Sequence, residues 1–157
     1  TIEEAKMIIK KFRNEFPDIT IATDIITGYP TETGDDYSLT LDFIREIRPD
    51  VLNLSKFSKH KNTPAENLKD IPIEIMNKRN QETMRLHRDT ALENKKKFLD
   101  RKINVFVNKK ISGNLYEARD ENYNIVLINS DENLLGKNID VKIVQSGVYH
   151  VVGQWRT

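Results

Sequence analysis

The sequence predicts an α/β segment followed by a small all-β domain. Residues 1–57 alternate between helix-like and strand-like hydrophobic periods, which is typical of βα units around a parallel sheet. Toward the end of the chain, short β-branched runs recur between Gly, Asn and Asp turns, at the spacing of a small antiparallel barrel. A long charged stretch with helical periodicity separates the two patterns. We therefore expect boundaries at residues 1–71, 72–100 and 101–157.

The first segment is predicted to form a helix, a strand, a helix and a strand, in that order. A helix is expected near residues 1–15, and the β-branched run 19–26 suits a strand buried on both faces, as in a parallel sheet. Thr33 followed by Asp36 resembles a capping box, which predicts that a helix begins there and ends before Pro49. Residues 51–57 then form a second short strand. This order is typical of βα units.

The second and third segments differ in period. Pro72 suits the first turn of a long helix that runs to about Leu99. Its apolar residues form one narrow stripe of Ile73, Met76, Met84, Ala91 and Phe98. After this helix we expect four short strands, at residues 103–107, 124–128, 139–144 and 148–152.

Charge is distributed unevenly although the chain is nearly neutral, with a net charge of +1. Residues 1–77 carry a net charge of −4, residues 78–110 carry +7, and residues 111–157 carry −2. The basic band is dense enough to attract a phosphate backbone. A solvated helix face that keeps the protein soluble explains the same charges equally simply.

Cysteine is absent from the whole sequence, and no apolar stretch approaches the length of a membrane helix. The chain itself therefore supplies no disulfide, no cysteine nucleophile and no thiolate ligand for an iron-sulfur cluster. We expect a cytoplasmic protein with no membrane partner. The chain starts at Thr1 inside a helical pattern, and two parallel strands are too few for a covered sheet, so we expect a piece of a longer protein.

Polar residues and a glycine turn follow the first predicted strand, where α/β folds usually bind their ligands. Gly28 allows close approach of the backbone to a ligand, and Glu32 can accept hydrogen bonds from hydroxyl groups. A turn alone would also contain Gly and Pro. After the second strand, His60 can titrate near neutral pH, but its lysine neighbours favour a neutral, solvated ring. We predict no metal site.

Two motifs resemble the radical S-adenosylmethionine (SAM) methylthiotransferases. Residues 23–37, TDIITGYPTETGDDY, resemble the family segment TDIIVGFPGETEEDF, and residues 57–65, FSKHKNTPA, resemble YSPRPGTPA. The basic helix and small β-domain resemble the link to a C-terminal TRAM domain, an RNA-binding barrel of the OB type. The wording of residues 52–57, LNLSKF, is most similar to the archaeal and eukaryotic branch, which modifies N6-threonylcarbamoyladenosine beside the tRNA anticodon.

The resemblance implies a fold, a reaction and a set of partners. The first segment would be the terminal βα units of a radical SAM barrel, a partial TIM-like barrel. The reaction would use SAM and 4Fe-4S clusters to install a methylthio group on the base, on a tRNA anticodon stem-loop. The cluster cysteines are missing here and are expected in the remaining N-terminal part of the same protein. This chain by itself is therefore expected to be inactive.

The resemblance also implies site residues. No catalytic residue and no metal ligand lie in this chain. The residues expected to bind SAM are Asp24, Ile26, Gly28, Glu32, Phe57 and Ser58, with Glu32 closing the turn. The residues expected to bind RNA are Lys95, Lys96, Lys97, Arg101, Lys102, Lys109, Lys110, Arg119 and Lys137.

Aromatic residues of the β-domain offer stacking surfaces for unpaired bases. Tyr116, Tyr123, Tyr149 and Trp155 are candidates, but the strand pattern favours Tyr123 and Tyr149 as core residues. The chain departs from the family where Thr31 replaces a glycine and where His60-Lys61-Asn62 replaces Arg-Pro-Gly. These departures leave the conformation of both loops and any anion binding by the second one open.

Two hypotheses from different classes remain. The first makes the chain the C-terminal part of a tRNA methylthiotransferase, with the related ribosomal-protein and isopentenyladenosine methylthiotransferases as close variants. The second makes it a stand-alone RNA-binding module whose βα portion never binds SAM. Both predict RNA binding that weakens steeply as salt is added.

Overall fold

The computed structural model describes residues 1–156 and contains three helices and seven strands within them. These residues separate into two compact units, and the chain passes from one to the other within the last helix. The first unit comprises residues 1–17 and 21–90, and the second comprises residues 18–20 and 91–157. The expected boundaries at residues 71 and 100 stay predictions.

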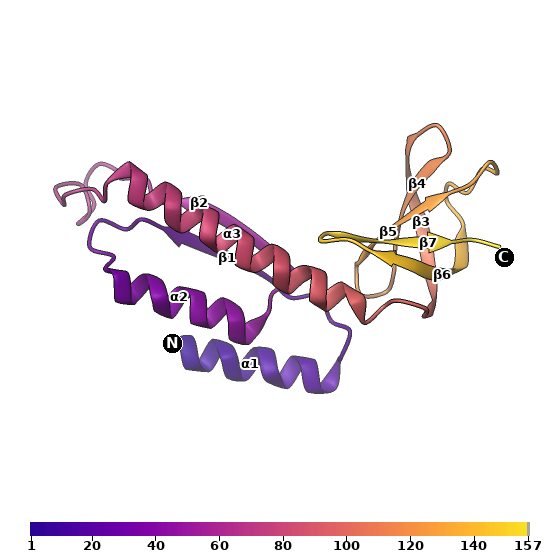
Figure 1. Ribbon diagram of the computed structural model, residues 1–157, viewed down its shortest axis with the longest axis horizontal. Coiled ribbons are helices and arrows are strands. Elements are labelled where there is room, and N and C mark those ends of the chain that lie inside the picture. Colours follow the sequence, from indigo (N-terminus) through magenta and orange to yellow (C-terminus); the bar gives the residue numbers. More distant parts are fainter. Residues whose placement is uncertain (157) are drawn as a thin grey trace. The chain divides into compact units, whose positions relative to one another are not determined.

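The first unit holds a two-stranded parallel sheet and its helices. The elements, in chain order, are α1 (Ile2–Glu15), β1 (Ala22–Thr27), α2 (Gly34–Ile47), β2 (Val51–Lys56) and α3 (Ile73–Lys96) (Figure 1). Thr33 caps α2: its hydroxyl accepts from the Asp36 backbone, and the Asp36 side chain accepts from the Thr33 backbone. The predicted capping box is therefore confirmed.

Helix α3 lies against the sheet through polar contacts. The Thr27 hydroxyl bonds the Asn80 side chain, and the Lys56 amino group donates to Asn77 Oδ1 at 2.7 Å. The predicted apolar stripe of α3 is only partly correct, because the buried positions include Thr83, His87 and Thr90 beside Ala91, while Ile73 is exposed. The period of 3.6 was present, but polar residues carry much of it.

The expectation that β1 is buried on both faces is wrong for the described structure. The side chains of β1 alternate between exposed and partly buried, and Ile26 is 63% exposed. β1 pairs only with β2. Helix α3 bonds Thr27, whose side chain points to the face of the sheet opposite Ile26, so only that face is covered. A near-continuous apolar run therefore does not by itself show that both faces are covered.

The second unit is a closed five-stranded barrel. Its strands are β3 (Lys102–Ser112), β4 (Leu115–Arg119), β5 (Ile125–Asn129), β6 (Asn138–Ser146) and β7 (His150–Gln154), arranged in the order β3-β4-β5-β7-β6. β6 returns to pair with β3 and closes the barrel. Twelve buried residues fill it, including Phe98 from the end of the basic stretch and Leu134 from the β5–β6 connection.

Two barrel predictions need correction. The sequence predicted four strands, and β4 was missed because Glu117 and Arg119 alternate with its two buried residues, Tyr116 and Ala118. The barrel was expected to be antiparallel throughout, but β5 and β7 are parallel. Successive strands still alternate in direction, and β5 and β7 are parallel because β6, which lies between them in sequence, pairs with β3 and β7 instead of β5.

Candidate functional site

The turn after β1 is built around Gly28. Gly28 has a φ of +84°, a left-handed conformation that favours glycine. A Cβ atom there would lie 2.6 Å from the Met76 sulfur of α3, so a larger residue would also have to displace that side chain. The Gly28 N–H donates to Glu32 Oε2 at 2.8 Å, and the Glu32 N–H donates to the Tyr29 carbonyl at 2.8 Å. Glu32 therefore closes the turn, as expected.

Glu32 is also paired with α3. The Arg79 guanidinium bonds Glu32 Oε1, and the side chain of each residue is only 12% exposed. Arg79 donates in addition to the Thr33 carbonyl at 3.1 Å, and its guanidinium carbon lies 5.1 Å from the centre of the Tyr37 ring. Both Glu32 carboxylate oxygens are thus committed within the protein. In this structure Glu32 holds the turn and pairs with α3, and its contact with SAM stays a prediction.

The open face of the sheet carries the other residues expected to bind SAM. Asp24 lies opposite Asn53, whose amide donates to Asp24 Oδ1 at 2.7 Å. Ile26 follows Asp24 on the same face, opposite Ser55. The carboxyl ends of β1 and β2 therefore place a polar pair beside an exposed apolar side chain.

The segment after β2 adds an aromatic edge. The Phe57 N–H donates to the Thr27 carbonyl at 2.8 Å, which prolongs the pairing of the two strands. The Phe57 ring meets the Tyr29 ring edge to face, with centroids 4.9 Å apart. Ser58 follows and is exposed. The structure thus brings five of the six expected residues to one edge of the sheet and turns Glu32 inward.

The basic residues expected to bind RNA separate into different environments. Lys95 is only 4% exposed, and its amino group donates to Asn124 Oδ1. Lys96 is exposed and pairs with Glu93. Lys97 and Arg101 both pair with Asp18, and the hydrogen bond from Arg101 is the main reason why the pKa of Asp18 lies below its usual value. Lys95 is therefore not part of the basic surface.

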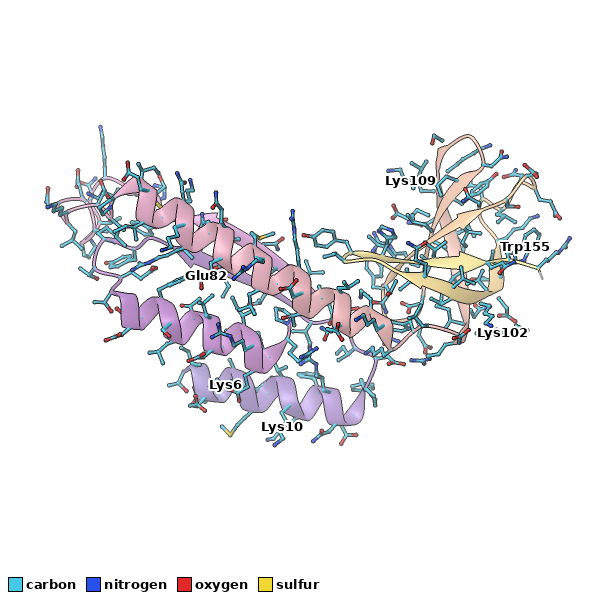
Figure 2. The ribbon with its side chains drawn as sticks, viewed as in Figure 1. Lys6, Lys10, Glu82, Lys102, Lys109 and Trp155 are labelled. Atoms are coloured by element: carbon cyan, nitrogen blue, oxygen red, sulfur yellow. The ribbon has the colours of Figure 1, made fainter. Side chains whose placement is uncertain are left out.

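The remaining basic residues lie on the barrel. Lys102 and Lys109 are exposed near the two ends of β3 (Figure 2). Lys110 is exposed, with its amino group 5.5 Å from the Tyr116 ring centre. Lys137 is exposed just before β6. Arg119 is partly buried and donates to Glu117 at 3.1 Å.

The aromatic assignments from sequence are reversed. Tyr116 is 2% exposed and belongs to the barrel core, whereas Tyr123 is 73% exposed and Tyr149 is also exposed. Trp155 packs against the core and is partly buried. Tyr123 sits in a turn with a φ of +67° rather than in a strand, so strand alternation does not apply to it.

Sequence reasoning also missed residues that shape these sites. Arg79 and Asn80 were passed over, although both lie one turn from Thr83 on the buried face of α3. His87 is fully buried, and burial lowers its pKa, while contacts with Asp50 and the backbone of Pro49 oppose this shift. Helical spacing was the available signal for all of them.

Neither a metal cluster nor a membrane helix is found in the part of the chain that the structure describes. Residues 1–156 contain no group of three or more His, Asp or Glu side chains placed to hold a metal ion. None of their helices combines the length and apolar character needed to cross a membrane.

Relatives identify the kind of protein. The chain is 36% identical, over 98% of its length, to the probable threonylcarbamoyladenosine tRNA methylthiotransferase of Archaeoglobus fulgidus, of which it covers 36%. It is 32% identical over 93% of its length to the tRNA-2-methylthio-N(6)-dimethylallyladenosine synthase of Carboxydothermus hydrogenoformans, covering 34% of that protein. No protein-family model matches the chain. The chain belongs to the methylthiotransferase family.

The chain spans about a third of the length of the curated relatives it matches. A third relative, the ribosomal protein uS12 methylthiotransferase RimO of Desulfitobacterium hafniense, is 30% identical over 98% of the chain, which covers 36% of that relative. The alignments therefore extend across both units, to relatives whose names give different substrates.

The two loops in which Thr31 and Asn62 replace a glycine of the family motifs keep an acceptable backbone conformation. Asn62 stands where the family motif has its glycine and adopts a φ of +62°, a conformation that asparagine tolerates better than most residues. Its N–H donates to Glu66 Oε2 at 2.8 Å. Thr31, at the other lost glycine, is not among the described residues with positive φ. Neither replacement therefore requires a strained backbone beyond what Asn accepts.

Proposed function

We propose that the chain supplies part of the SAM site and the RNA-binding domain of a radical SAM methylthiotransferase that modifies N6-threonylcarbamoyladenosine in tRNA. The observation that carries the proposal is the alignment across both units with a relative named for that reaction. The LNLSKF wording at residues 52–57 supports this branch over the uS12 and dimethylallyladenosine enzymes. The anticodon stem-loop is the proposed target.

The carboxyl edge of β1 and β2 suits a nucleoside ligand. Ile26 offers an apolar surface for a purine, and the Asp24–Asn53 pair offers hydrogen-bonding groups for ribose hydroxyls. Phe57 and Ser58 extend this edge, while Glu32 and Gly28 hold the turn in place. When bound, SAM would supply the radical chemistry and the methyl group; these side chains would bind and orient it.

Iron-sulfur clusters are a different matter for this chain. The sequence has no cysteine, and residues 1–156 contain no alternative cluster of metal ligands. Its own residues therefore do not fit a 4Fe-4S cluster, and we assign them no step through one. Their proposed role is confined to SAM and RNA.

The barrel is proposed to be the TRAM domain that holds the RNA. Its strand order, with the third and fifth strands parallel, is that of an OB-type barrel, a fold that commonly binds oligonucleotides through strand faces and loops. The exposed lysines Lys102, Lys109, Lys110 and Lys137 line its strands and loops. Together with Lys96 and Lys97 they provide the charge for phosphate contacts.

A chimera tests the proposal. The 154 aligned residues of the Archaeoglobus relative are replaced by this chain, and tRNA carrying N6-threonylcarbamoyladenosine is analysed for a methylthio group by mass spectrometry. We expect product from the chimera. Ile26→Lys should abolish it, whereas Val51→Lys, on the same face but at the amino end of the strand, should leave most of it. A folded chimera that binds tRNA but forms no product would contradict the proposal.

The stand-alone RNA-binding module remains the alternative, because the barrel and basic residues serve it equally well. It predicts that the chain binds tRNA but not SAM. Equilibrium dialysis of the chain and of the chimera against labelled SAM separates the two: retention by the chimera that Ile26→Lys removes supports the enzyme, and no retention supports the module.

A further inference from the structure

The Tyr123 ring is exposed on the second unit, with a guanidinium group against it. It is 73% exposed, and the Arg119 guanidinium carbon lies 4.8 Å from its ring centre. Arg119 also donates to the Tyr123 carbonyl at 3.0 Å and to Glu117 at 3.1 Å. The guanidinium therefore covers one face of the ring and is itself fixed. An aromatic ring backed by a cation is a good stacking surface for a nucleobase.

The loop that carries Tyr123 is held from within. Asp120 Oδ1 accepts from the N–H groups of Asn122 at 3.0 Å and Asn124 at 2.7 Å, and Asp120 Oδ2 accepts from the Asn124 side-chain amide at 2.8 Å. Tyr123 adopts a φ of +67°, which is uncommon for an aromatic residue. The loop therefore holds the ring in a conformation that the residue would seldom choose alone.

The same loop is anchored from two distant segments. Lys95 donates to Asn124 Oδ1, and the Thr20 hydroxyl donates to the Asn122 carbonyl at 2.6 Å. Both anchors belong to the second unit. Because the loop is ordered before any ligand arrives, stacking on Tyr123 would cost little further conformational entropy.

A cavity of about 460 Å³ adjoins this loop. Phe106 lines it and is the β-ladder partner of Arg119, so the cavity also has an exposed aromatic residue beside the arginine. The volume of the cavity is within the range of small-molecule pockets and exceeds that of a single nucleobase.

Three cations and three acids line the cavity, and two of the cations, Arg101 and Arg119, already pair with Asp18 and Glu117. Arg101, Lys102 and Arg119 line it, and the acidic residues are Asp18, Asp120 and Glu121. Asp18 is neutralised by Lys97 and Arg101, and the Asp120 carboxylate is occupied by loop N–H groups. Lys102 is exposed and has no ion-pair partner within residues 1–156. Asp120 and Glu121 oppose a phosphate, and Glu121 lies on the exposed loop.

We infer that Tyr123 and the adjoining cavity bind one unpaired RNA nucleotide, with the base stacked on the free face of the Tyr123 ring and the phosphate near Lys102. This inference rests on the proposed RNA-binding role and adds a specific subsite to it. It differs from the strand faces and the β3–β4 and β6–β7 loops that OB-type barrels commonly use. Fully paired RNA cannot use the subsite, because its bases are already stacked.

The test uses the full chain and two RNA probes: a hairpin with 2-aminopurine in its unpaired loop, and a fully paired duplex of equal length. We expect fluorescence quenching on hairpin binding. Tyr123→Ala should abolish the quenching and weaken hairpin binding about 5- to 100-fold, with duplex binding unchanged. Tyr123→Phe should retain both. Phe16→Ala, which removes an exposed aromatic ring of the first unit, should change hairpin affinity less than threefold.

The outcomes separate the subsite from the broader proposal. Wild-type chain that binds neither probe would overturn the RNA-binding role itself. Equal hairpin binding by wild type and Tyr123→Ala, in variants with unchanged circular dichroism spectra, would overturn the subsite alone. Free adenosine monophosphate that binds as tightly as the hairpin would also overturn it, because the site would then be one for mononucleotides. Lys102→Ala should lower the salt dependence of hairpin binding without removing the quenching.

Discussion

The two units of this chain solve the problem of burying a sheet in different ways. The five-stranded barrel pairs every strand on both sides and fills its interior with side chains that are almost fully buried. The two-stranded parallel sheet leaves Ile26 and Val51 exposed, and α1 has no buried residue at all. A closed barrel abolishes its edges, whereas a parallel sheet depends on additional strands and crossovers. The barrel is therefore the self-sufficient part of the chain.

The largest expected effect comes from the barrel core. Ile128→Ala should lower the free energy of unfolding by about 2–5 kcal/mol, because Ile128 is fully buried among core residues. Ile26→Ala should change it by no more than about 0.5 kcal/mol. In urea titrations, fluorescence of Trp155, which packs on the barrel core, measures the Ile128→Ala effect, and circular dichroism at helical wavelengths measures the Ile26→Ala effect in the first unit. Equal losses in the two variants would break the comparison.

The ion pair of the first unit should rank next. Arg79→Met removes the cation beside the mostly buried Glu32 carboxylate, and we expect a loss of about 2–4 kcal/mol in the free energy of unfolding, measured by circular dichroism at helical wavelengths. Arg45→Met is the matched control, because the Arg45–Asp42 pair is largely exposed and should contribute less than about 1 kcal/mol. A loss as small as that of the control would show that the clamp on the Gly28 turn is dispensable.

A smaller effect is expected where the basic stretch enters the barrel unit. Lys95→Met removes the hydrogen bond to Asn124 and should cost about 1–2 kcal/mol, with faster hydrogen exchange in residues 120–124. Lys96→Met should leave both unchanged, since Lys96 is exposed. It should instead weaken RNA binding slightly at low salt. Identical behaviour of the two variants would contradict the division of the lysine run into a buried and an exposed part.

The smallest effect concerns pH and should be confined to the first unit. Burial lowers the pKa of His87 in the folded chain, so the unfolded state binds the proton more readily. Stability should be complete above the ordinary histidine pKa of about 6.5 and should fall as the pH drops below it. Hydrogen exchange in α3 at pH 7 and pH 5.5 measures this, and His87→Gln should reduce the difference. Equal acceleration in β5 would contradict a local origin.

The regular elements were the most predictable from sequence. Thr33 and Asp36 predict the start of α2, and Pro72 predicts the start of α3. Both predictions succeed because helix capping and the preference for proline in the first turn depend only on neighbouring residues. The edge formed by Asp24, Ile26 and Phe57 followed from the rule that carboxyl ends of parallel strands meet. The assignment of SAM-binding and RNA-binding residues came from the resemblance to the family motifs and not from the pattern of helices and strands.

The unpredicted features depend on partners distant in sequence. Lys95 is indistinguishable from Lys96 and Lys97 by type, and only its contact with Asn124 buries it. Tyr123 was assigned to the core by a strand pattern that begins only after it, at Ile125. The inward contact of Glu32 was not predicted, because its partner, Arg79, lies 47 residues further along. Each error is a tertiary contact overriding a local pattern.

The short segment 18–20 has a consequence for how the chain is made. It lies between α1 and β1 in sequence but belongs to the barrel unit, where Thr20 bonds a carbonyl 102 residues further on. At a ribosomal rate of about 5–20 residues per second, the partner loop emerges roughly 5–20 s after it. The newly made segment must stay accessible during that interval. Truncating the chain before the barrel therefore removes Thr20, one of the anchors of the Tyr123 loop. An insertion near residue 20 would disturb the position of the same loop.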